Sequence, residues 1–470
     1  MKQFLYYTTA FILIAFCGCK KYLDINTDPN LVTDPPINGL LANATMQTGW
    51  NTQRMGNLTS YYVQYLSSPN TGSDRDTYKE EDLSTTWSNF YNTMTDIVKM
   101  NELATTLGSS EHLGVGKVMM AIHLNMLINM FGDVPYSQAF KSVEVLLPAY
   151  DNQETLHATS IQLLDEAVTE LNKTDSKLKL DKNSDVIHAG NLTAWKKTAF
   201  TLKARFLNQL SKRTDKYNTA NILAAVSNGY TSNADDASSN AYQGGRSPWN
   251  QIAYNNTQLL LDGWLSEQFV DALDGTSYGV FDPRLRLITD TTKFGDYRGT
   301  TNGKGRTGTG TSMEESYLSL NGFYSKAGAP VAIATYSELK FIEAEAAFRA
   351  NDRARAYAAY REGIKANMMK IGAIPADTTA YLSNPAVSVG VANLTVADIF
   401  REKYVAMFLH PEAWVDARRF DFMYKDFTLP VGAALPTFIR RGAYPVVETS
   451  RNGDNVPATN GLTDRLWWDK

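Results

Sequence analysis

Apolar side chains recur at steps of three and four residues through several long stretches of the chain, with polar residues between them. The clearest stretch is residues 192–210. Its apolar stripe is formed by Leu192, Trp195, Ala199, Leu202, Phe206 and Leu210. This spacing places the apolar side chains on one face of an amphipathic α-helix. Because residues 84–107, 113–131 and 155–172 repeat the pattern, we predict an all-α fold.

A pair of helices is predicted in the C-terminal third, over residues 335–371. The first helix is rich in alanine, and a short polar turn follows at Asn351 to Arg353. In the second helix one face carries Ala356, Tyr360 and Ile364. Small residues let two helices approach closely, so we expect an antiparallel pair that resembles a tetratricopeptide unit.

The start of a further helix is marked by its capping residues. Thr395 and Asp398 have the spacing of a capping box, in which each side chain bonds to the backbone of the other residue. Leu394 and Ile399 fit the apolar contact that often accompanies such a box. A helix should therefore begin at Thr395.

The helical pattern stops between residues 228 and 333. This region is rich in Gly, Asn, Ser and aromatic residues. Long stretches without regular structure inside a compact domain are usually functional. We therefore expect the helices to form a scaffold and the loop-rich region 228–333 to carry the function.

The N-terminus changes abruptly from apolar to polar. Its apolar run ends at about Gly18 and is too short to span a bilayer comfortably, so we interpret residues 1–18 as a secretory signal. Cleavage needs a small residue before the cut, which Gly18 supplies for Cys19, whereas bulky Phe16 precedes Cys17. Cys19 is therefore the predicted first residue of the mature protein.

This arrangement resembles the lipobox of bacterial lipoproteins, in which the cysteine carries the lipid. Two or three acyl chains would anchor the protein stably, because one chain gives only marginal membrane binding. Polar residues, Pro and Asp-Pro follow, so residues 19–39 are predicted to be a lipid-anchored tether. The alternative is a soluble secreted protein with a stray cysteine.

The composition indicates a large globular protein. The chain has 470 residues, of which 43% are hydrophobic and 20% are charged, enough for a large core and too apolar for disorder. No linker-like stretch divides the chain after the tether, so residues 40–470 are predicted to form one domain. The net charge of -4 comes without a basic stripe, which argues against a nucleic-acid partner.

Two sequences that look catalytic do not have the required context. Gly275 to Gly279 spell G-x-S-x-G, but a helix-like segment precedes the serine where a nucleophile elbow needs a strand. Gly303 to Gly308 spell G-x-G-x-x-G without a strand before or a helix after them. We interpret the first as a turn and the second as a flexible loop, and we expect no catalysis.

No metal-ligand spacing is evident. The five histidines neither pair at i,i+4 nor stand beside a cysteine: His112, His123, His157, His188 and His410. Zinc and other cofactors are therefore not expected. Asp271 and Asp274 could act as the catalytic pair of a glycosidase only if their carboxyl groups lay at a suitable distance from each other. Calcium in the Asp-rich loops stays open, although the EF-hand spacing is lacking.

Several segments, in order along nearly the whole chain, resemble the SusD/RagB family of outer-membrane nutrient-binding lipoproteins. They are the lipobox Cys19 with DINTDPN (24–30), FGDVPYSQAF (131–140), FDPRL (281–285), TYSELKFIEAEAAFRAN (335–351), IFREKYVAMFLHPEAWVDARRFDF (399–422) and RRGAYPVVETSRN (440–452). Six such segments in the right order are hard to obtain by chance.

The resemblance implies an all-α SusD-like fold with tetratricopeptide-like helix pairs. It also implies a non-catalytic lipoprotein of the outer membrane, facing the cell exterior, that captures oligosaccharides and delivers them to a SusC-like TonB-dependent transporter. The same family includes peptide-binding members of the RagB type, which is the first alternative. A lipid-anchored hydrolase is the second.

The motif residues themselves are expected to determine the fold. Gly132 and Pro135 would shape a turn after a helix rich in methionine. Trp414 and Arg418 are i,i+4 neighbours that can stack. Asp416, Arg418 and Arg419 are expected to bridge charged partners between helices.

The ligand surface is predicted on residues 241–256, with Trp249 as the leading residue. Its expected neighbours are Tyr242, Arg246 and Tyr254. Aromatic rings can stack on sugars, and polar side chains flank these rings. Pro248 and the nearby glycines favour an exposed rim over a core helix. The alternative is that Trp249 fills a gap beneath the loop.

Overall fold

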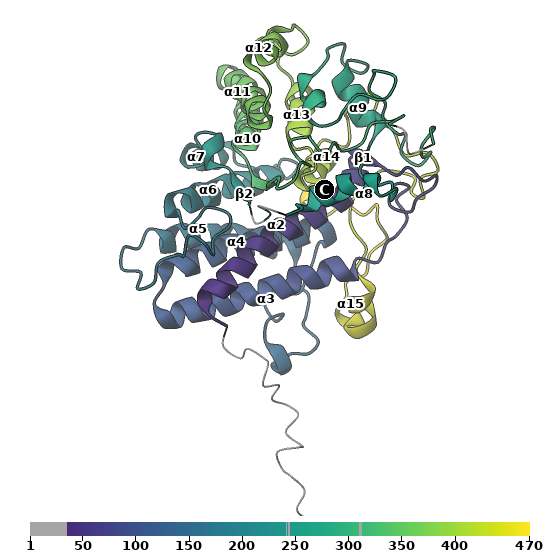
Figure 1. The fold of residues 1–470 in the computed structure, drawn as a ribbon. Coiled ribbons are helices and arrows are strands. Elements are labelled where there is room, and N and C mark those ends of the chain that lie inside the picture. Colours follow the sequence, from purple (N-terminus) through teal and green to yellow (C-terminus); the bar gives the residue numbers. More distant parts are fainter. Residues whose placement is uncertain (1–34, 241, 243–244, 310–312) are drawn as a thin grey trace, which may run out of the picture.

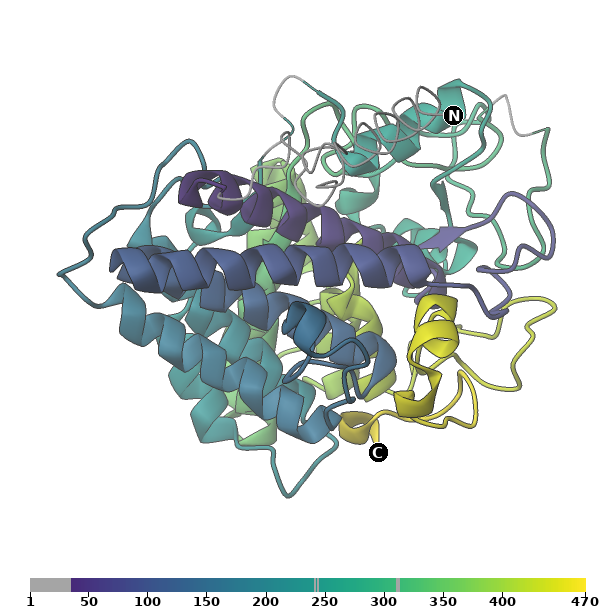
Figure 2. The ribbon, with the colours of Figure 1, turned by 90° about the horizontal axis from the view of Figure 1, so that it is seen from below.

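The computed structural model describes residues 35–240, 242, 245–309 and 313–470. The N-terminal half is a layer of long antiparallel helices. Its helices are α2 (Ile37–Tyr62), α3 (Ser84–Leu107), α4 (Ser110–Phe131), α5 (Gln153–Leu171), α6 (Leu192–Gln209) and α7 (Thr219–Asn228). Figure 2 shows α2 and α3 side by side along one face of the molecule. The predicted helices over residues 84–107, 113–131, 155–172 and 192–210 are confirmed.

Helix α4 is the centre of this layer. It packs against α2, α3, α5 and α6, which explains why its sequence is apolar on all sides. In the described part of the chain it is the one helix long and apolar enough to cross a membrane, yet 83% of its most apolar window is buried inside the protein. We therefore assign α4 as a core helix.

The predicted helix pair in the C-terminal half is confirmed. Helix α10 (Tyr336–Arg349) and α11 (Arg353–Ile371) pack along each other. Small residues permit this contact, because a Cβ atom on Gly363 of α11 would lie only 3.0 Å from the Phe341 ring of α10. The turn between them contains Asn351 in the left-handed region, with a φ of 62°.

Four further helices complete the chain after this pair: α12 (Pro375–Ser383), α13 (Val396–Ala406), α14 (Glu412–Arg419) and α15 (Val446–Arg451). Helix α13 starts as predicted, since the Thr395 hydroxyl accepts from the Asp398 backbone and the Asp398 carboxylate accepts from the Thr395 backbone. Leu394 and Ile399 lie in the same buried cluster, as expected for the accompanying apolar contact.

The loop-rich region contains short elements, some of which contact α2. They are β2 (Ala237–Ser239), α8 (Pro248–Thr257), β3 (Trp264–Leu265), α9 (Glu267–Asp274) and β4 (Val331–Ala334). Strand β3 pairs with β1 (Leu66–Ser67), and β2 pairs with β4, both antiparallel. Figure 1 shows this region and α8 on the side of the molecule away from α3.

The expectation of an exposed rim instead of a core helix at Trp249 is wrong, because residues 248–257 form α8. Pro248 occupies the first helical turn, and the Ser247 hydroxyl accepts a hydrogen bond from the Asn250 backbone. Both features favour helix initiation. The Ser-Pro pair was the signal for this helix, within a stretch that otherwise looks like a loop.

The family-like motif residues stabilise the core, as expected. Arg418 stacks on Trp414, with its guanidinium carbon 3.5 Å from the ring centroid. Arg419 pairs with Glu345 of α10 at 2.8 Å and with Asp416 at 2.6 Å. All five side chains are buried, so removing one partner of these ion pairs would leave an uncompensated buried charge.

The turn after α4 also agrees with expectation. Gly132 has a φ of 88°, in the region that favours glycine. The Pro135 carbonyl accepts a hydrogen bond of 2.7 Å from the Tyr91 hydroxyl of α3. The turn is therefore fixed to the helical layer.

Candidate ligand-binding surface

Two of the four predicted ligand-binding residues lie in the core. Trp249 is 4% exposed and Tyr242 is 6% exposed, and both belong to the main hydrophobic cluster. Tyr242 packs edge-on against Trp50 of α2, with 5.8 Å between the ring centroids. Trp249 therefore anchors α8 in the core, and Tyr242 packs on the helical layer.

The other two predicted residues, Arg246 and Tyr254, lie on the outer side of α8. The Arg246 side chain is exposed, and its guanidinium carbon lies 3.3 Å from the centroid of the half-buried Tyr254 ring. Arg246 also donates a 3.4 Å hydrogen bond to the Gln251 side chain. The structure thus brings Arg246 and Tyr254 together at the surface.

The polar row continues along α8 with residues that the sequence did not single out. The Gln251 amide donates to the Asn255 side chain at 2.9 Å, and the Asn255 amide donates to the Asp262 carboxylate at 3.2 Å. We call Arg246, Gln251, Tyr254, Asn255 and Asp262 the α8 surface. Gln251, Tyr254 and Asn255 lie on α8 at steps of three and four residues, which would have predicted a shared face if α8 itself had been predicted. Arg246 precedes the helix and Asp262 follows it.

The loop after α8 is held in a strained shape beside this surface. Asn256 anchors it by accepting hydrogen bonds from the Asp262 backbone and from the Trp264 indole nitrogen. Leu259 has a φ of 62° and is 65% exposed, and Leu260 is 67% exposed. A leucine in the left-handed region is uncommon and is often found at functional sites.

The first catalytic-looking sequence is a turn in the structure, as predicted. The second is a loop, but it is packed against other segments instead of being flexible. Ser277 is 2% exposed and follows Gly275, whose φ of 103° ends α9. Gly303 and Gly305 also have left-handed φ values, of 80° and 79°. The Gly303 carbonyl accepts from the Gly72 backbone, so this loop is packed against the chain after β1.

Asp271 and Asp274 do not face one recess together. Asp271 lines a recess of 100 Å³ beside Glu267 and Asp426, while the Asp274 carboxylate accepts from the Thr276 backbone at the end of α9. Burial, followed by the charges of Asp274, Glu267 and Asp426, raises the pKa of Asp271 to about 6. Within the described ranges, no group of three metal-binding side chains gathers here or elsewhere.

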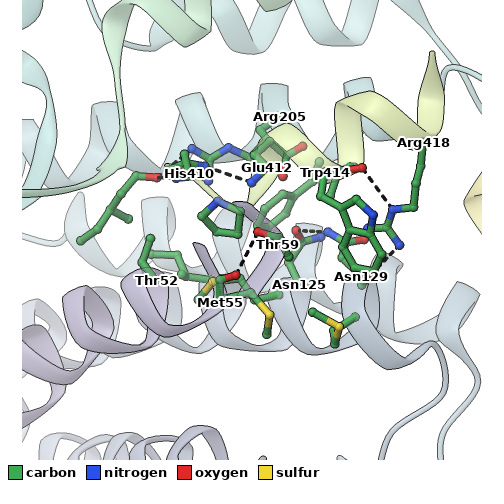
Figure 3. A pocket seen from close by; sticks show the side chains of 17 residues that line it. Thr52, Met55, Thr59, Asn125, Asn129, Arg205, His410, Glu412, Trp414 and Arg418 are labelled. Atoms are coloured by element: carbon green, nitrogen blue, oxygen red, sulfur yellow. Dashed lines mark hydrogen bonds between the residues drawn. The ribbon is translucent and has the colours of Figure 1, made fainter. Parts of the chain in front are cut away.

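The cavity drawn in Figure 3 lies inside the protein, between α2, α4, α6 and α14. Its lining is a mixture of methionines and polar groups, including Asn125, Arg205, His410 and Glu412. The Glu412 carboxylate accepts hydrogen bonds of 3.0 Å from Gln209. At 30 Å³ the cavity has room for one or two water molecules and not for a sugar.

Three of the five histidines, His112, His123 and His157, are buried. His123 and His157 are buried, and burial lowers the pKa of each to about 4. The His123 ring bonds to the Met119 carbonyl. These two side chains are therefore neutral at physiological pH. The predicted lipidation residue, Cys19, lies outside the described residues.

Comparisons with known proteins agree with this architecture. Residues 29–445 match a family model described as SusD-like, "Starch-binding associating with outer membrane". A search of the curated proteins gave no match.

Solved structures show the same fold at low sequence identity. A SusD/RagB family protein from Bacteroides thetaiotaomicron is 21% identical with a TM-score of 0.75, covering 93% of this chain and 99% of its own. A chitin-binding SusD homologue from Flavobacterium johnsoniae is 21% identical with a TM-score of 0.76, covering 92% and 98%. A SusD homologue from Parabacteroides distasonis is 20% identical with a TM-score of 0.75, covering 93% and 98%. Since the family model spans most of the sequence, the chain belongs to the SusD-like family.

Proposed function

We propose that this chain is a non-catalytic lipoprotein of the outer membrane that captures oligosaccharides at the cell surface. Membership of a family described as starch-binding and associated with the outer membrane supports the ligand class and the location. A similar structure belongs to a chitin-binding protein. The role of this chain in glycan capture therefore rests on the family and on the chemistry of its surface.

The observation that carries the proposal is the α8 surface. Arg246, Asn255 and Asp262 offer hydrogen-bond donors and acceptors side by side, in a row linked by hydrogen bonds through Gln251. Tyr254 adds an aromatic ring that can pack against sugar C–H groups. A saccharide needs this combination of polar groups and a ring on an open surface.

Peptide capture is the alternative function. The strands in the described residues support it less well than they would if they were long. A peptide that adds to a sheet needs a long exposed strand edge. The strands in the described residues have two to four residues each. Their edges are therefore too short to bind an extended peptide through its backbone.

We also propose delivery to a SusC-like TonB-dependent transporter. The family membership and the predicted lipid tether support this partner, because the tether would keep the protein near barrels of the same membrane. Native purification in mild detergent tests the proposal. We expect a barrel protein to co-purify, and recovery of the lipoprotein alone would contradict a stable complex.

The capture proposal is tested by calorimetric titration of the chain from residue 20 onward with maltoheptaose and chitohexaose. Replacing a ring or a guanidinium that contacts the sugar should weaken binding by about tenfold. We therefore expect Tyr254→Ala and Arg246→Ala to lose affinity while their melting temperatures stay near that of the parent.

Arg353→Ala is the matched control, because Arg353 also stacks on a ring, at 3.9 Å from Phe348, but far from α8. It should bind sugar as the parent does. Binding of peptides and not of either sugar by the parent protein would favour the alternative function.

A further inference from the structure

An open recess lies between α12 and the segment that follows α9, away from the α8 surface. Its lining residues are Gly279, Val280, Phe281, Pro283, Arg286, Asp377, Ala380, Tyr381 and Asn384. We call it the α12 recess. Figure 1 shows α9 and α12 at the same end of the molecule. Its volume of 340 Å³ falls within the range of small-molecule binding sites.

The inner wall of the α12 recess is fixed by buried charges. The Tyr381 hydroxyl donates a hydrogen bond of 2.8 Å to Glu402. Glu402 in turn accepts from Arg284, which also pairs with Asp282, each at 2.5 Å. Arg284, Asp282 and Glu402 are all buried. A wall held in this way keeps its shape without a ligand, as a preorganised binding site requires.

The mouth of the recess carries an exposed ring and two exposed charges. The Arg286 guanidinium carbon lies 4.6 Å from the centroid of the half-exposed Phe281 ring. Arg286 and Asp377 approach to 3.8 Å, with 58% and 37% of their side chains exposed. This distance is too long for a hydrogen bond, so the two charged groups do not bond directly to each other.

The charges indicate which kind of ligand fits. An anion bound to Arg286 would lie beside the Asp377 carboxylate, and a cation bound to Asp377 would lie beside the guanidinium. Like charges held close together disfavour either ligand. A neutral polyol avoids this conflict, because each hydroxyl group can both accept from Arg286 and donate to Asp377.

We propose that the α12 recess is a second saccharide-binding site, separate from the α8 surface. Arg286 and Asp377 bind neighbouring hydroxyl groups, and Phe281 packs against the C–H groups of the same sugar ring. The Asn384 side chain lies at the rim, where its amide can bind the next sugar unit. This inference rests on the proposed function of oligosaccharide capture.

The test is a calorimetric titration of the chain from residue 20 onward with maltoheptaose and chitohexaose, comparing variants of both sites. For Arg286→Ala and Asp377→Asn we expect one of two binding events to weaken by about tenfold or more. Arg246→Ala should weaken the other event and leave this one unchanged. Melting temperatures near that of the parent would exclude unfolding as the cause.

A matched control exists in the same region. Arg298 stacks on Phe294 at 4.2 Å and pairs with Asp296 at 2.7 Å, which gives the same three residue types outside the recess. Arg298→Ala should bind both sugars as the parent protein does. Equal losses in Arg298→Ala and Arg286→Ala would overturn the site, because exposed Arg–Phe pairs in general would then be responsible.

The outcomes for the two proposals are distinct. Sugar binding that is weakened by Arg246→Ala but unchanged by Arg286→Ala and Asp377→Asn overturns the α12 recess and leaves the capture function in place. Absence of binding of either sugar to the parent protein contradicts both. A crystal soaked with chitobiose provides the direct view, in which we expect the sugar beside Phe281.

Discussion

The Trp249 side chain, on the inner side of α8, is buried in the core, and only 4% of its surface is exposed. We expect Trp249→Ala to lower the free energy of unfolding by about 3 to 5 kcal/mol, because removing a buried tryptophan leaves a cavity. Urea unfolding measures this loss, and Tyr254→Ala serves as the half-exposed control with a smaller loss. If Trp249 bound ligand, Trp249→Ala would instead lower the affinity for sugar with little change in melting temperature.

Among the described residues, Glu412 is a buried carboxyl group with no ion pair at hydrogen-bond distance, and its carboxylate accepts from Gln209. Burial raises its pKa from 4.5 to about 7, although Arg205 and Lys403 oppose the shift. Asp416 and Glu338 add to it through their negative charges. Glu412 therefore holds its proton more tightly in the folded protein than in the unfolded chain.

This shift predicts how stability depends on pH. Between about pH 4.5 and 7 the folded state binds more protons than the unfolded state, so the free energy of unfolding falls as pH rises. Across this window the free energy of unfolding should fall by about 3 kcal/mol because of Glu412. Glu412→Gln keeps the shape without the charge, so its stability should fall less across this window when urea unfolding is compared at several pH values. Parallel curves for variant and parent would contradict this assignment.

Single residues were predictable where their partners stand close in the sequence. The contact of Trp414 with Arg418 follows from i,i+4 spacing on a helix, and the structure confirms it. The burial of Trp249 could not be decided in that way, because the space it fills is made by residues of other elements. Local spacing carries no information about such distant partners.

At the scale of elements, the capping box of α13 allows a direct test. The Thr395 hydroxyl accepts from the Asp398 backbone at 3.2 Å. We expect Thr395→Ala to lower the free energy of unfolding by about 1 kcal/mol, since the backbone donors at the helix start lose their acceptor. Thr395→Ser keeps the hydroxyl and should retain most of the stability in the same urea titration. An equal loss in both variants would point to the methyl group instead of the cap.

Helix bounds were predictable where a regular pattern covers several turns. Helix α3 occupies residues 84–107 as predicted, and α6 ends one residue before the predicted position. Helix α8 was missed because its buried apolar side chains, Trp249, Ile252 and Ala253, cover little more than one turn and follow a segment rich in glycine. Its Ser247 cap and Pro248 were the available signals.

At the scale of the whole molecule, the candidate sites join segments that are far apart in the sequence. Arg286 follows the D-P-R motif, while Asp377 lies on α12, beyond the α10 and α11 pair. The family-like motifs predicted the fold because they lie in its core. The recess at their edge depends on how the loop-rich region packs against α12, which no local pattern records.

A lipid tether at the predicted position would set how far the folded body can lie from a membrane. The predicted end of the tether at residue 39 is wrong, because α2 already begins at Ile37. The 16 residues from Lys20 to Pro35 reach at most about 58 Å when fully extended. If lipid is attached at Cys19, the body therefore stays within roughly its own diameter of the bilayer. Binding sites on the body would then sample the space beside the outer membrane and its transporters.

Lipid attachment at Cys19 is tested by separating membrane and soluble fractions of cells that express the full chain. We expect Cys19→Ala to move the protein out of the membrane fraction, because the apolar side chains of the folded body are largely packed inside it and two or three acyl chains supply the stable anchor. Cys17→Ala is the matched control, since it removes the neighbouring thiol and leaves Gly18 before Cys19. This control should stay with the outer membrane after a high-salt wash. Retention of Cys19→Ala under the same wash would show that another part of the chain holds the protein at the membrane.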